Sequence, residues 1–500
     1  MPFRSIHRSV ADRAAELPDA TLFELPGGRS VTYAETIELT QRIAARLVAD
    51  GVMPGDRVAM QVGKSWEAIA LYLAVLRIGG MFLPLNTAYT GHEMDHFLSD
   101  AEPRVLVCSP ERCDEYTSRA GALVVETLGT QGDGTLLDGR ECYADTYDAT
   151  PSDPAAILYT SGTTGRSKGA VLTHENLASN CATLTEAWRF TGADRLIHAL
   201  PIFHTHGLFV AMNLVMTTGA SALYLPKFDL DAVVGLLPRA TVLMGVPTFY
   251  TRLAADPRVD RDRVASMRLF VSGSAPLLAS DHAAFAERTG HAILERYGMT
   301  ETNMNTSNPY EGLRKPGTVG PALPGIDVRV VDRESGAPLP DGEIGSIEVR
   351  GPNVFAGYWK LPEKTAAEFR DDGFFITGDV GRIDEDGYIV IVGRDKDLVI
   401  SGGFNVYPRE IEELIDAHPD VLESAVVGVP HPDFGETVVA VVVPASGATP
   451  DGASILRYIA PELARFKQPR AVEIVEALPR NVMGKVQKAE LRKRYAGLFA

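Results

Sequence analysis

The feature that most constrains the fold is an alternation of short apolar runs with longer amphipathic segments through most of the chain. Runs such as DRVAMQV, RVLVCS and TVLMGVP have the length and composition of buried strands, whereas ETIELTQRIAARLVADG and WEAIALYLAVLRIGG have helical spacing. Strands that alternate with helices favour parallel sheets covered by helices on both faces. A large α/β domain is therefore predicted for the N-terminal part.

The pattern changes twice toward the C-terminus. Residues 319–391 carry short alternating runs separated by SG and DG turns, which is typical of β-hairpins. A helix is predicted to begin near Pro408, followed by strand-like runs such as TVVAVVVP. The predicted fold class is thus α/β, with a large N-terminal domain of parallel-rich sheets plus a β-rich subdomain, and a small mobile α+β C-terminal domain. The predicted divisions are an N-terminal domain at 1–393, a hinge at 394–397 and a C-terminal domain at 398–500.

The charge balance excludes several classes of partner. Forty-eight basic and 65 acidic residues give a formal net charge of -17, which opposes nucleic-acid binding by an extended basic surface. No apolar run approaches the ~18 residues of a membrane helix, and the first residues lack signal-peptide features, so we expect a cytoplasmic protein without membrane association. The four cysteines show no CxxC pairing, so reduced thiols are expected.

A loop rich in glycine and hydroxyl side chains follows the apolar strand AAILYT. It runs from Thr160 to Gly169 with the sequence TSGTTGRSKG, in which exposed N–H groups, hydroxyls and Lys168 suit a polyphosphate. Its spacing differs from the Walker loop, and no GxGxxG follows a strand. A plain surface turn is the alternative interpretation, and the density of donors after a buried strand argues against it.

This loop resembles the signature of the adenylate-forming superfamily, which includes acyl-CoA synthetases, peptide-synthetase adenylation domains and luciferases. Further matching motifs occur in the family's order along essentially the whole chain. They are HTHG at 204–207, GSAPL at 273–277, ERYGMTETN at 295–303, TGD at 377–379, GRDKDLVISGGFNVYP at 393–408 and PRNVMGKVQK at 479–488.

The resemblance implies a two-step reaction that needs ATP, Mg²⁺ and coenzyme A. A carboxylate attacks the α-phosphate of ATP, and catalysis rests on positioning and charge neutralisation rather than on a protein nucleophile. It implies that Glu301 binds Mg²⁺, Thr300 contacts the α-phosphate, Tyr297 stacks on adenine, and Asp379 with Arg394 binds the ribose. The ATP or AMP site implied as a whole is Thr160, Ser161, Gly162, Thr163, Thr164, Gly165, Lys168, Ser274, Ala275, Pro276, Glu295, Tyr297, Gly298, Met299, Thr300, Asp379, Arg394 and Lys485.

The C-terminal part carries three further implied roles. Lys485, in a basic loop of an acidic chain, would bridge the carboxylate and the α-phosphate. Its context also resembles acyltransferase targets, so acetylation of Lys485 is a hypothesis for switching the enzyme off. Lys396 matches the hinge about which the small domain rotates between the two half-reactions. The residues implied to line the coenzyme A tunnel are Gly402, Gly403 and Phe404.

The acid substrate is indicated by Arg252 in GVPTFYTRLAAD. An arginine facing an acyl pocket would require a paired anion, which favours a dicarboxylate held by its second carboxylate. The segments around 204–211 and 295–312 look closely like bacterial malonyl-CoA synthetases, which also accept methylmalonate. The implied acyl-site residues are His206, Arg252, Ser274 and Met304. The two histidines of HTH are too weak a pattern to predict a metal site.

Three alternatives stay open at this point. A medium- or long-chain fatty acyl-CoA synthetase is favoured if Arg252 points outward. A carrier-loading adenylation domain is disfavoured because no carrier segment with its serine is visible. A non-catalytic adenylate-binding regulator would lack Lys485, Glu301 or the hinge motif, and this chain has all three. The sequence does not distinguish a monomer from a homodimer.

Overall fold

The structure is a computed structural model that describes residues 3–118, 123–139, 141–160, 167–401, 404–480 and 485–499. By its internal contacts the chain forms two compact units. The first combines Met1–Val328 with Val349–Phe375, and the second combines Arg329–Glu348 with Ile376–Ala500. The second unit includes the predicted hinge at 394–397, whose role as a hinge stays a prediction.

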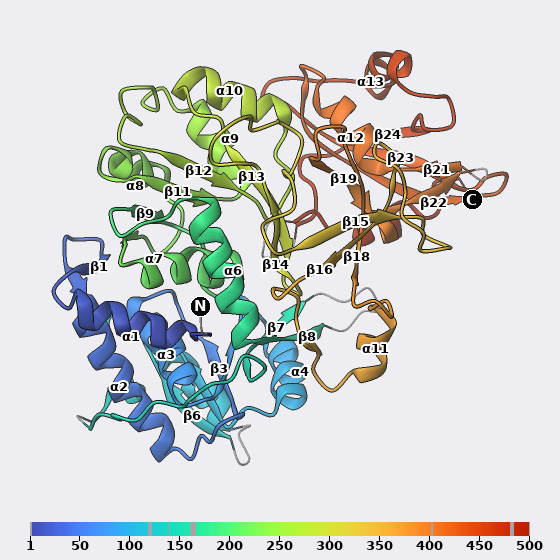
Figure 1. Cartoon of the computed structure of the whole chain (residues 1–500). Helices are drawn as coiled ribbons and strands as arrows, with labels where there is room; N and C mark the ends of the chain where they lie inside the picture. Colours follow the sequence, from blue (N-terminus) through green and yellow to red (C-terminus); the bar gives the residue numbers. More distant parts are fainter. Residues whose placement is uncertain are drawn as a thin grey trace. The chain divides into compact units, whose positions relative to one another are not determined.

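An eight-stranded sheet forms one core of the first unit. Its central strands are parallel, and β13–β14 at one edge is antiparallel. Helices α9 and α10 lie beside strands β11 to β13 (Figure 1). In sheet order the strands are β14 (Asn303–Ser307), β13 (Leu294–Met299), β12 (Leu269–Ser272), β11 (Val242–Gly245), β9 (Arg195–His198), β10 (Ser221–Tyr224), β1 (Thr21–Glu24) and β2 (Ser30–Thr32).

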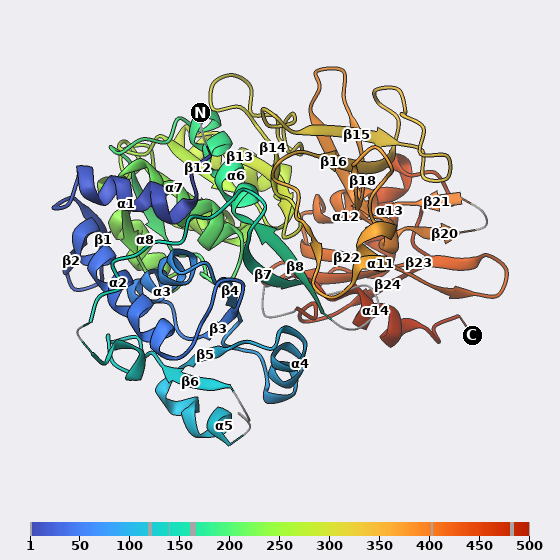
Figure 2. The same ribbon diagram turned by 60° about the horizontal axis from the view of Figure 1, so that its bottom comes forward.

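A seven-stranded sheet forms the other core of this unit. The pairs β3–β4, β3–β5, β4–β7 and β5–β6 are parallel, and β7–β8 is an antiparallel hairpin. Helix α5 lies beside β6 at one end of the sheet (Figure 2). In sheet order the strands are β17 (Gly357–Tyr358), β8 (Lys168–Thr173), β7 (Pro154–Thr160), β4 (Met81–Pro84), β3 (Arg57–Gln61), β5 (Val105–Cys108) and β6 (Val124–Thr127).

Several helices of the first unit, α2, α3, α4, α6 and α8, begin at a residue whose side chain caps the helix. Thr32 and Glu35 form a capping box at the start of α2, and every residue of the apolar α3 is buried. The helices are α1 (Ile6–Glu16), α2 (Tyr33–Ala49), α3 (Trp66–Arg77), α4 (Gly91–Ala101), α5 (Cys113–Thr117), α6 (His174–Ala187), α7 (Asn213–Thr218), α8 (Leu230–Leu236), α9 (Pro247–Ala255), α10 (Ala279–Thr289) and α11 (Pro362–Ala367).

The second unit contains two sheets, as the change to alternating hairpins predicts. A four-stranded sheet has the order β15 (Asp327–Val331), β16 (Gly345–Arg350), β18 (Phe375–Ile383) and β19 (Ile389–Arg394). The other sheet has the order β21 (Phe404–Val406), β20 (Val399–Ser401), β23 (Gly435–Pro444) and β22 (Val421–His431), with β24 (Ala471–Ile474) also paired to β23. Its helices are α12 (Pro408–Asp416), α13 (Gly452–Ile459) and α14 (Lys488–Tyr495).

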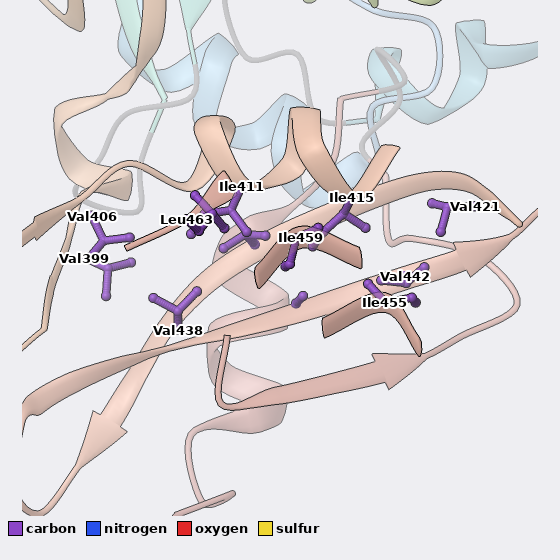
Figure 3. Close-up of a cluster of buried hydrophobic side chains, with 12 residues drawn as sticks. Val399, Val406, Ile411, Ile415, Val421, Val438, Val442, Ile455, Ile459 and Leu463 are labelled. Atoms are coloured by element: carbon purple, nitrogen blue, oxygen red, sulfur yellow. The ribbon is translucent and has the colours of Figure 1, made fainter. Parts of the chain in front are cut away.

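Aliphatic side chains join the helices of the second unit to its larger sheet. Ile411 and Ile415 of α12 and Ile455 and Ile459 of α13 pack with Val438 and its neighbours on the strands (Figure 3). Such burial contributes roughly 25 cal/mol for each Å² of apolar surface removed from water. The predicted fold class, with parallel-rich sheets and a separate C-terminal α+β part, is confirmed. In the portion of the chain that is described, no helix is long and apolar enough to cross a membrane.

Candidate active site

The hairpin β7–β8 positions the first pair of predicted residues. β7 ends at Thr160 and β8 begins at Lys168, and these two residues are direct partners across the antiparallel pair. The loop between them is therefore anchored at both ends by the sheet. Of the predicted loop residues, Ser161, Gly162, Thr163, Thr164 and Gly165 lie outside the described residues.

Glu301 lies in the tight connection between β13 and β14. Gly298 is required there because an added Cβ would lie 1.8 Å from the carbonyl oxygen of Asn303. Asn303 itself has a left-handed backbone with φ 49°. This close return of the chain holds Glu301 in a buried position at the end of the sheet. The neighbouring predicted residues Tyr297, Met299 and Thr300 are partly exposed, and Glu295 is buried.

Two hydroxyl groups point at the Glu301 carboxylate. The Thr160 hydroxyl lies 3.3 Å from Oε1, and the Tyr358 hydroxyl lies 3.1 Å from the same oxygen. Tyr358 is on β17, which pairs with β8, so three segments distant in the sequence meet at this carboxylate. A buried carboxylate surrounded by hydroxyl oxygens is a suitable donor set for a hard cation.

Lys168 contacts a second carboxylate in the same region. Its Nζ lies 3.3 Å from Oε1 of Glu368 and 3.9 Å from the centre of the Tyr358 ring. Tyr358 donates its hydroxyl to Oε2 of Glu368 at 2.7 Å, and Lys364 Nζ lies 2.7 Å from Oε1. Although burial acts in the opposite direction, hydrogen bonds from Lys364 and Tyr358 hold the pKa of Glu368 below its usual value.

The predicted acyl residues His206 and Ser274 are brought together. His206 begins a π-helical segment that runs to Met212, and its Nδ1 lies 3.3 Å from the Ser274 hydroxyl. Ser274 has a left-handed backbone with φ 70°, an uncommon conformation for a side-chain-bearing residue. Burial, followed by the nearby charge of Arg296, lowers the pKa of His206 well below its usual value. The imidazole is therefore neutral at pH 7.

Arg296 is a charged residue of this region that the sequence analysis missed. It lies on β13, is only 4% exposed, and packs so closely on Gly273 that an added Cβ there would be 2.4 Å from Cζ. Its Nε and Nη2 are buried and have no hydrogen-bond partner among the described residues. Burial lowers the pKa of Arg296 to about 9, so the guanidinium is charged at neutral pH. The available signal was an arginine, next to Glu295, on a strand that has neighbouring strands on both sides.

Lys64 is a further basic residue of this region, and it contacts His198 on β9. Lys64 Nζ donates to Nδ1 of His198 at 2.7 Å and to its carbonyl oxygen at 2.8 Å, and lies 4.3 Å from the centre of the Tyr224 ring. His198 Nε2 in turn donates to the carbonyl of Gly207 at 2.7 Å. Lys64 and His198 thus hold the chain next to His206.

Arg252 does not lie in this buried cluster. Its side chain is exposed on α9, with the guanidinium 5.9 Å from the centre of the Phe228 ring. Met304 is buried on β14, opposite Gly298, and Ala275 and Pro276 are exposed. A separate cavity of about 260 Å³ is lined by Arg189, Ser307, Tyr310, Pro324 and their neighbours, and no predicted site residue is among the residues lining it.

In the second unit, the two predicted ribose residues form an ion pair. Asp379 on β18 and Arg394 on β19 are partners across the antiparallel pair, with Nε 2.7 Å from Oδ1. Arg394 also donates from Nη1 to the carbonyl of Thr377 at 3.3 Å. The register of the two consecutive strands places these residues opposite each other.

The remaining predicted residues are also in the second unit. Lys396 lies in a 3₁₀ turn whose acidic neighbours Asp395 and Asp397 pair with Arg333 and Arg492. Phe404 is 56% exposed and stacks on Phe466 with ring centres 4.6 Å apart. Lys485 is exposed. Gly402 and Gly403 lie outside the described residues.

Comparisons with known proteins cover almost the entire chain. Residues 10–359 match the family described as AMP-binding enzyme, and residues 410–485 match the AMP-binding enzyme C-terminal domain. The crystal structure of ATP-bound MatB from Rhodopseudomonas palustris has a TM-score of 0.96 and 57% identity, covering 99% of this chain and 100% of that chain.

Sequence relatives are named for different acid substrates. A feruloyl-CoA synthase from Amycolatopsis is 37% identical over 97% of both chains. A malonate–CoA ligase from Arabidopsis thaliana is 34% identical over 93% of this chain and 85% of the relative. The shared feature of these proteins is a ligase reaction that joins an acid to coenzyme A. The chain therefore belongs to the AMP-binding enzyme family and is an AMP-forming acyl-CoA ligase, an acid–thiol ligase.

Proposed function

We propose that this ligase converts malonate, and also methylmalonate, to its coenzyme A thioester. The observation that carries the proposal is Arg296, a buried guanidinium with two nitrogen atoms that lack hydrogen-bond partners. Burying a charge is unfavourable unless an opposite charge compensates it. A carboxylate at the far end of a short diacid would supply that charge and two acceptor oxygens.

The residues around Arg296 support a polar acid rather than an aliphatic chain. His206 and Ser274 present an imidazole and a hydroxyl, and the amine of Lys64 adds a further polar group behind His198. A long fatty acid would have to bury methylene groups against these polar atoms. One observation supports the alternative of a fatty acyl-CoA synthetase, namely that the side chain of Arg252 is exposed. In our proposal, Arg296 takes the role of the internal cation that was expected of Arg252.

The proposed chemistry has two steps. An oxygen of the substrate carboxylate bonds to the α-phosphorus of ATP as the bond to pyrophosphate breaks, which gives an acyl-adenylate. The sulfur of coenzyme A then bonds to the acyl carbon, AMP leaves with its bonding electron pair, and the thiol proton passes to solvent. Lys168 and Lys485 would neutralise negative charge on the phosphates in the first step, which is the main catalytic requirement for such a transfer.

Magnesium is the cofactor that we propose for the first step. Glu301 is buried, and the hydroxyl groups of Thr160 and Tyr358 both contact one of its carboxylate oxygens. Within the described residues there is no cluster of three or more His, Cys, Asp or Glu side chains. That fits Mg²⁺, which is commonly held by one or two carboxylates together with nucleotide phosphates and water. The metal would neutralise phosphate charge, and Glu301 would hold it.

The remaining roles are proposals for the second unit. Asp379 and Arg394 would bind the ribose, Lys396 would be the hinge, and Phe404 would line the thiol tunnel with Gly402 and Gly403. Acetylation of Lys485 would remove the charge that the adenylation step uses.

The test is a panel of acids assayed for pyrophosphate release and thioester formation with ATP, Mg²⁺ and coenzyme A. Malonate is expected to exceed acetate, succinate and octanoate, with methylmalonate second. Arg296→Met should lower malonate kcat/KM about 100-fold, the equivalent of a charged hydrogen bond, because the second carboxylate loses its partner. Lys485→Ala should abolish pyrophosphate release with every acid.

Arg252→Gln is the matched control, since it removes an arginine whose side chain is exposed. It should change malonate kcat/KM by less than about three-fold, as expected for an exposed charge. If Arg252→Gln has the large effect and Arg296→Met the small one, Arg252 is the carboxylate-binding residue. If octanoate is the best acid and neither variant matters, the malonate proposal is wrong.

A further inference from the structure

Three side chains outside the predicted site, Tyr358, Glu368 and Lys364, lie between or beside Lys168 and Glu301. Tyr358 donates to Oε2 of Glu368 at 2.7 Å and lies 3.1 Å from Oε1 of Glu301. Lys168 and Lys364 both contact the other oxygen of Glu368, at 3.3 Å and 2.7 Å. The phosphate-binding lysine and the magnesium-binding glutamate of the proposed site are thus both in contact with Tyr358, which donates its proton to Glu368.

Lys168 has a carboxylate partner within the protein. Its side chain is 12% exposed, so leaving it without a counter-charge would be unfavourable. Glu368 supplies the counter-charge, and the Tyr358 ring face lies 3.9 Å from the ammonium group. To bind the phosphates of ATP, Lys168 has to give up at least part of its contact with Glu368.

Lys364 makes that exchange less costly. It is the closer of the two lysines to Glu368, it binds the same oxygen, and its side chain is 39% exposed on α11. When Lys168 moves to a phosphate, Glu368 keeps one ammonium partner and the Tyr358 hydroxyl. No carboxylate is left unpaired in a partly buried position, so the cost of releasing Lys168 is reduced.

We propose that Glu368 and Lys364 are positioning residues for ATP, in which Glu368 holds Lys168 before the nucleotide binds and Lys364 replaces it afterwards. This inference rests on the proposed role of Lys168 in binding the phosphates. Tyr358 keeps Glu368 in place throughout, since its hydroxyl contacts the oxygen that neither lysine uses.

The experiment is a double-variant cycle on ATP affinity, measured by calorimetry with Mg²⁺ and without acid or coenzyme A, so that no turnover occurs. Lys364→Gln should weaken ATP binding about three- to ten-fold, because Glu368 then retains Lys168 more strongly. Glu368→Gln should leave affinity unchanged or improve it up to about five-fold. In the Glu368→Gln background, Lys364→Gln should have no further effect, since the competing carboxylate is gone.

Lys360→Gln is the matched control. It removes the same charge four residues earlier, where the lysine contacts Glu102 and the carbonyl of Asp100 instead of Glu368. It should leave ATP affinity within about two-fold of the wild type, as expected for an exposed ion pair.

Two results would overturn the inference. One is an equal effect of Lys364→Gln in both backgrounds, or in Lys360→Gln, which would indicate general loss of positive charge. The other is a loss of affinity in Glu368→Gln as large as in Lys168→Met, which would make Glu368 a direct part of the binding site. A wild-type protein that does not bind ATP at all would instead overturn the proposed function.

Discussion

The cations of the first unit occupy two contrasting settings. On the proposed phosphate side, Lys168 has Glu368 and the Tyr358 ring as partners within the protein. On the proposed acyl side, Arg296 is buried with two nitrogen atoms that have no hydrogen-bond partner in the described part of the chain. These two settings imply different contributions of the two cations to the free energy of ligand binding. In the proposed site the nucleotide would have to displace an existing partner of Lys168, whereas the acid would compensate the buried charge of Arg296.

The largest expected effect is a change in the protein's free energy of unfolding when Arg296 is replaced. Arg296→Met replaces a buried, uncompensated charge by an apolar side chain of similar length, so the free energy of unfolding should rise by about 1–4 kcal/mol. The same variant should lose malonate activity, which makes it a stability gain at the expense of function. Denaturant unfolding monitored by fluorescence or circular dichroism measures the change.

Arg268→Met is the control for this comparison. Arg268 binds Asp194 through two contacts of 2.7 Å and donates to the carbonyl of Trp188 at 3.0 Å. Removing it leaves Asp194, a buried carboxylate, without its cation, so the free energy of unfolding should fall by about 2–4 kcal/mol. If Arg296→Met destabilises the protein as much as Arg268→Met does, Arg296 is a structural residue and the contrast fails.

A smaller effect is expected from Lys168→Met on the phosphate side. Glu368 keeps Lys364 and Tyr358 in this variant, so the free energy of unfolding should change by less than about 1 kcal/mol. ATP affinity should fall about ten-fold, because a charge-assisted contact to phosphate is lost. Unfolding and ATP calorimetry on one preparation measure both quantities. A large loss of stability with unchanged ATP affinity would show that Lys168 serves the fold.

The sequence predicts the fold and part of the site for a physical reason. Helix and strand periodicity is local, so α2, α3 and the start of α12 at Pro408 follow from the spacing of apolar residues. Glycine-rich loops and the acidic turn at Glu301 are also contained in short contiguous motifs. These features can therefore be predicted without knowledge of the tertiary structure.

The residues that the sequence analysis missed depend on contacts between distant segments. Tyr358 reaches Glu301 only because β17 pairs with β8, and Glu368 meets Lys168 only because α11 follows that short strand. Arg296 becomes significant through its burial against Gly273, which neighbouring letters do not encode. Conversely, Arg252 has the expected chemistry at a position where the fold leaves its side chain exposed.

The smallest expected effect is a change in proton binding at His206. Burial and the charge of Arg296 hold the pKa of this imidazole well below its usual value in the ligand-free protein. A bound carboxylate would favour the imidazolium and raise the pKa of His206, so malonate binding should take up a few tenths of a proton at about pH 6 and fewer at about pH 7.5. Calorimetry in buffers of different ionisation enthalpy measures this uptake. Malonate has its own titration near pH 6, so the relevant quantity is the difference between the wild type and His206→Gln. If both proteins take up the same number of protons, no carboxylate binds next to His206. The histidine would then not be part of the proposed anion site at Arg296.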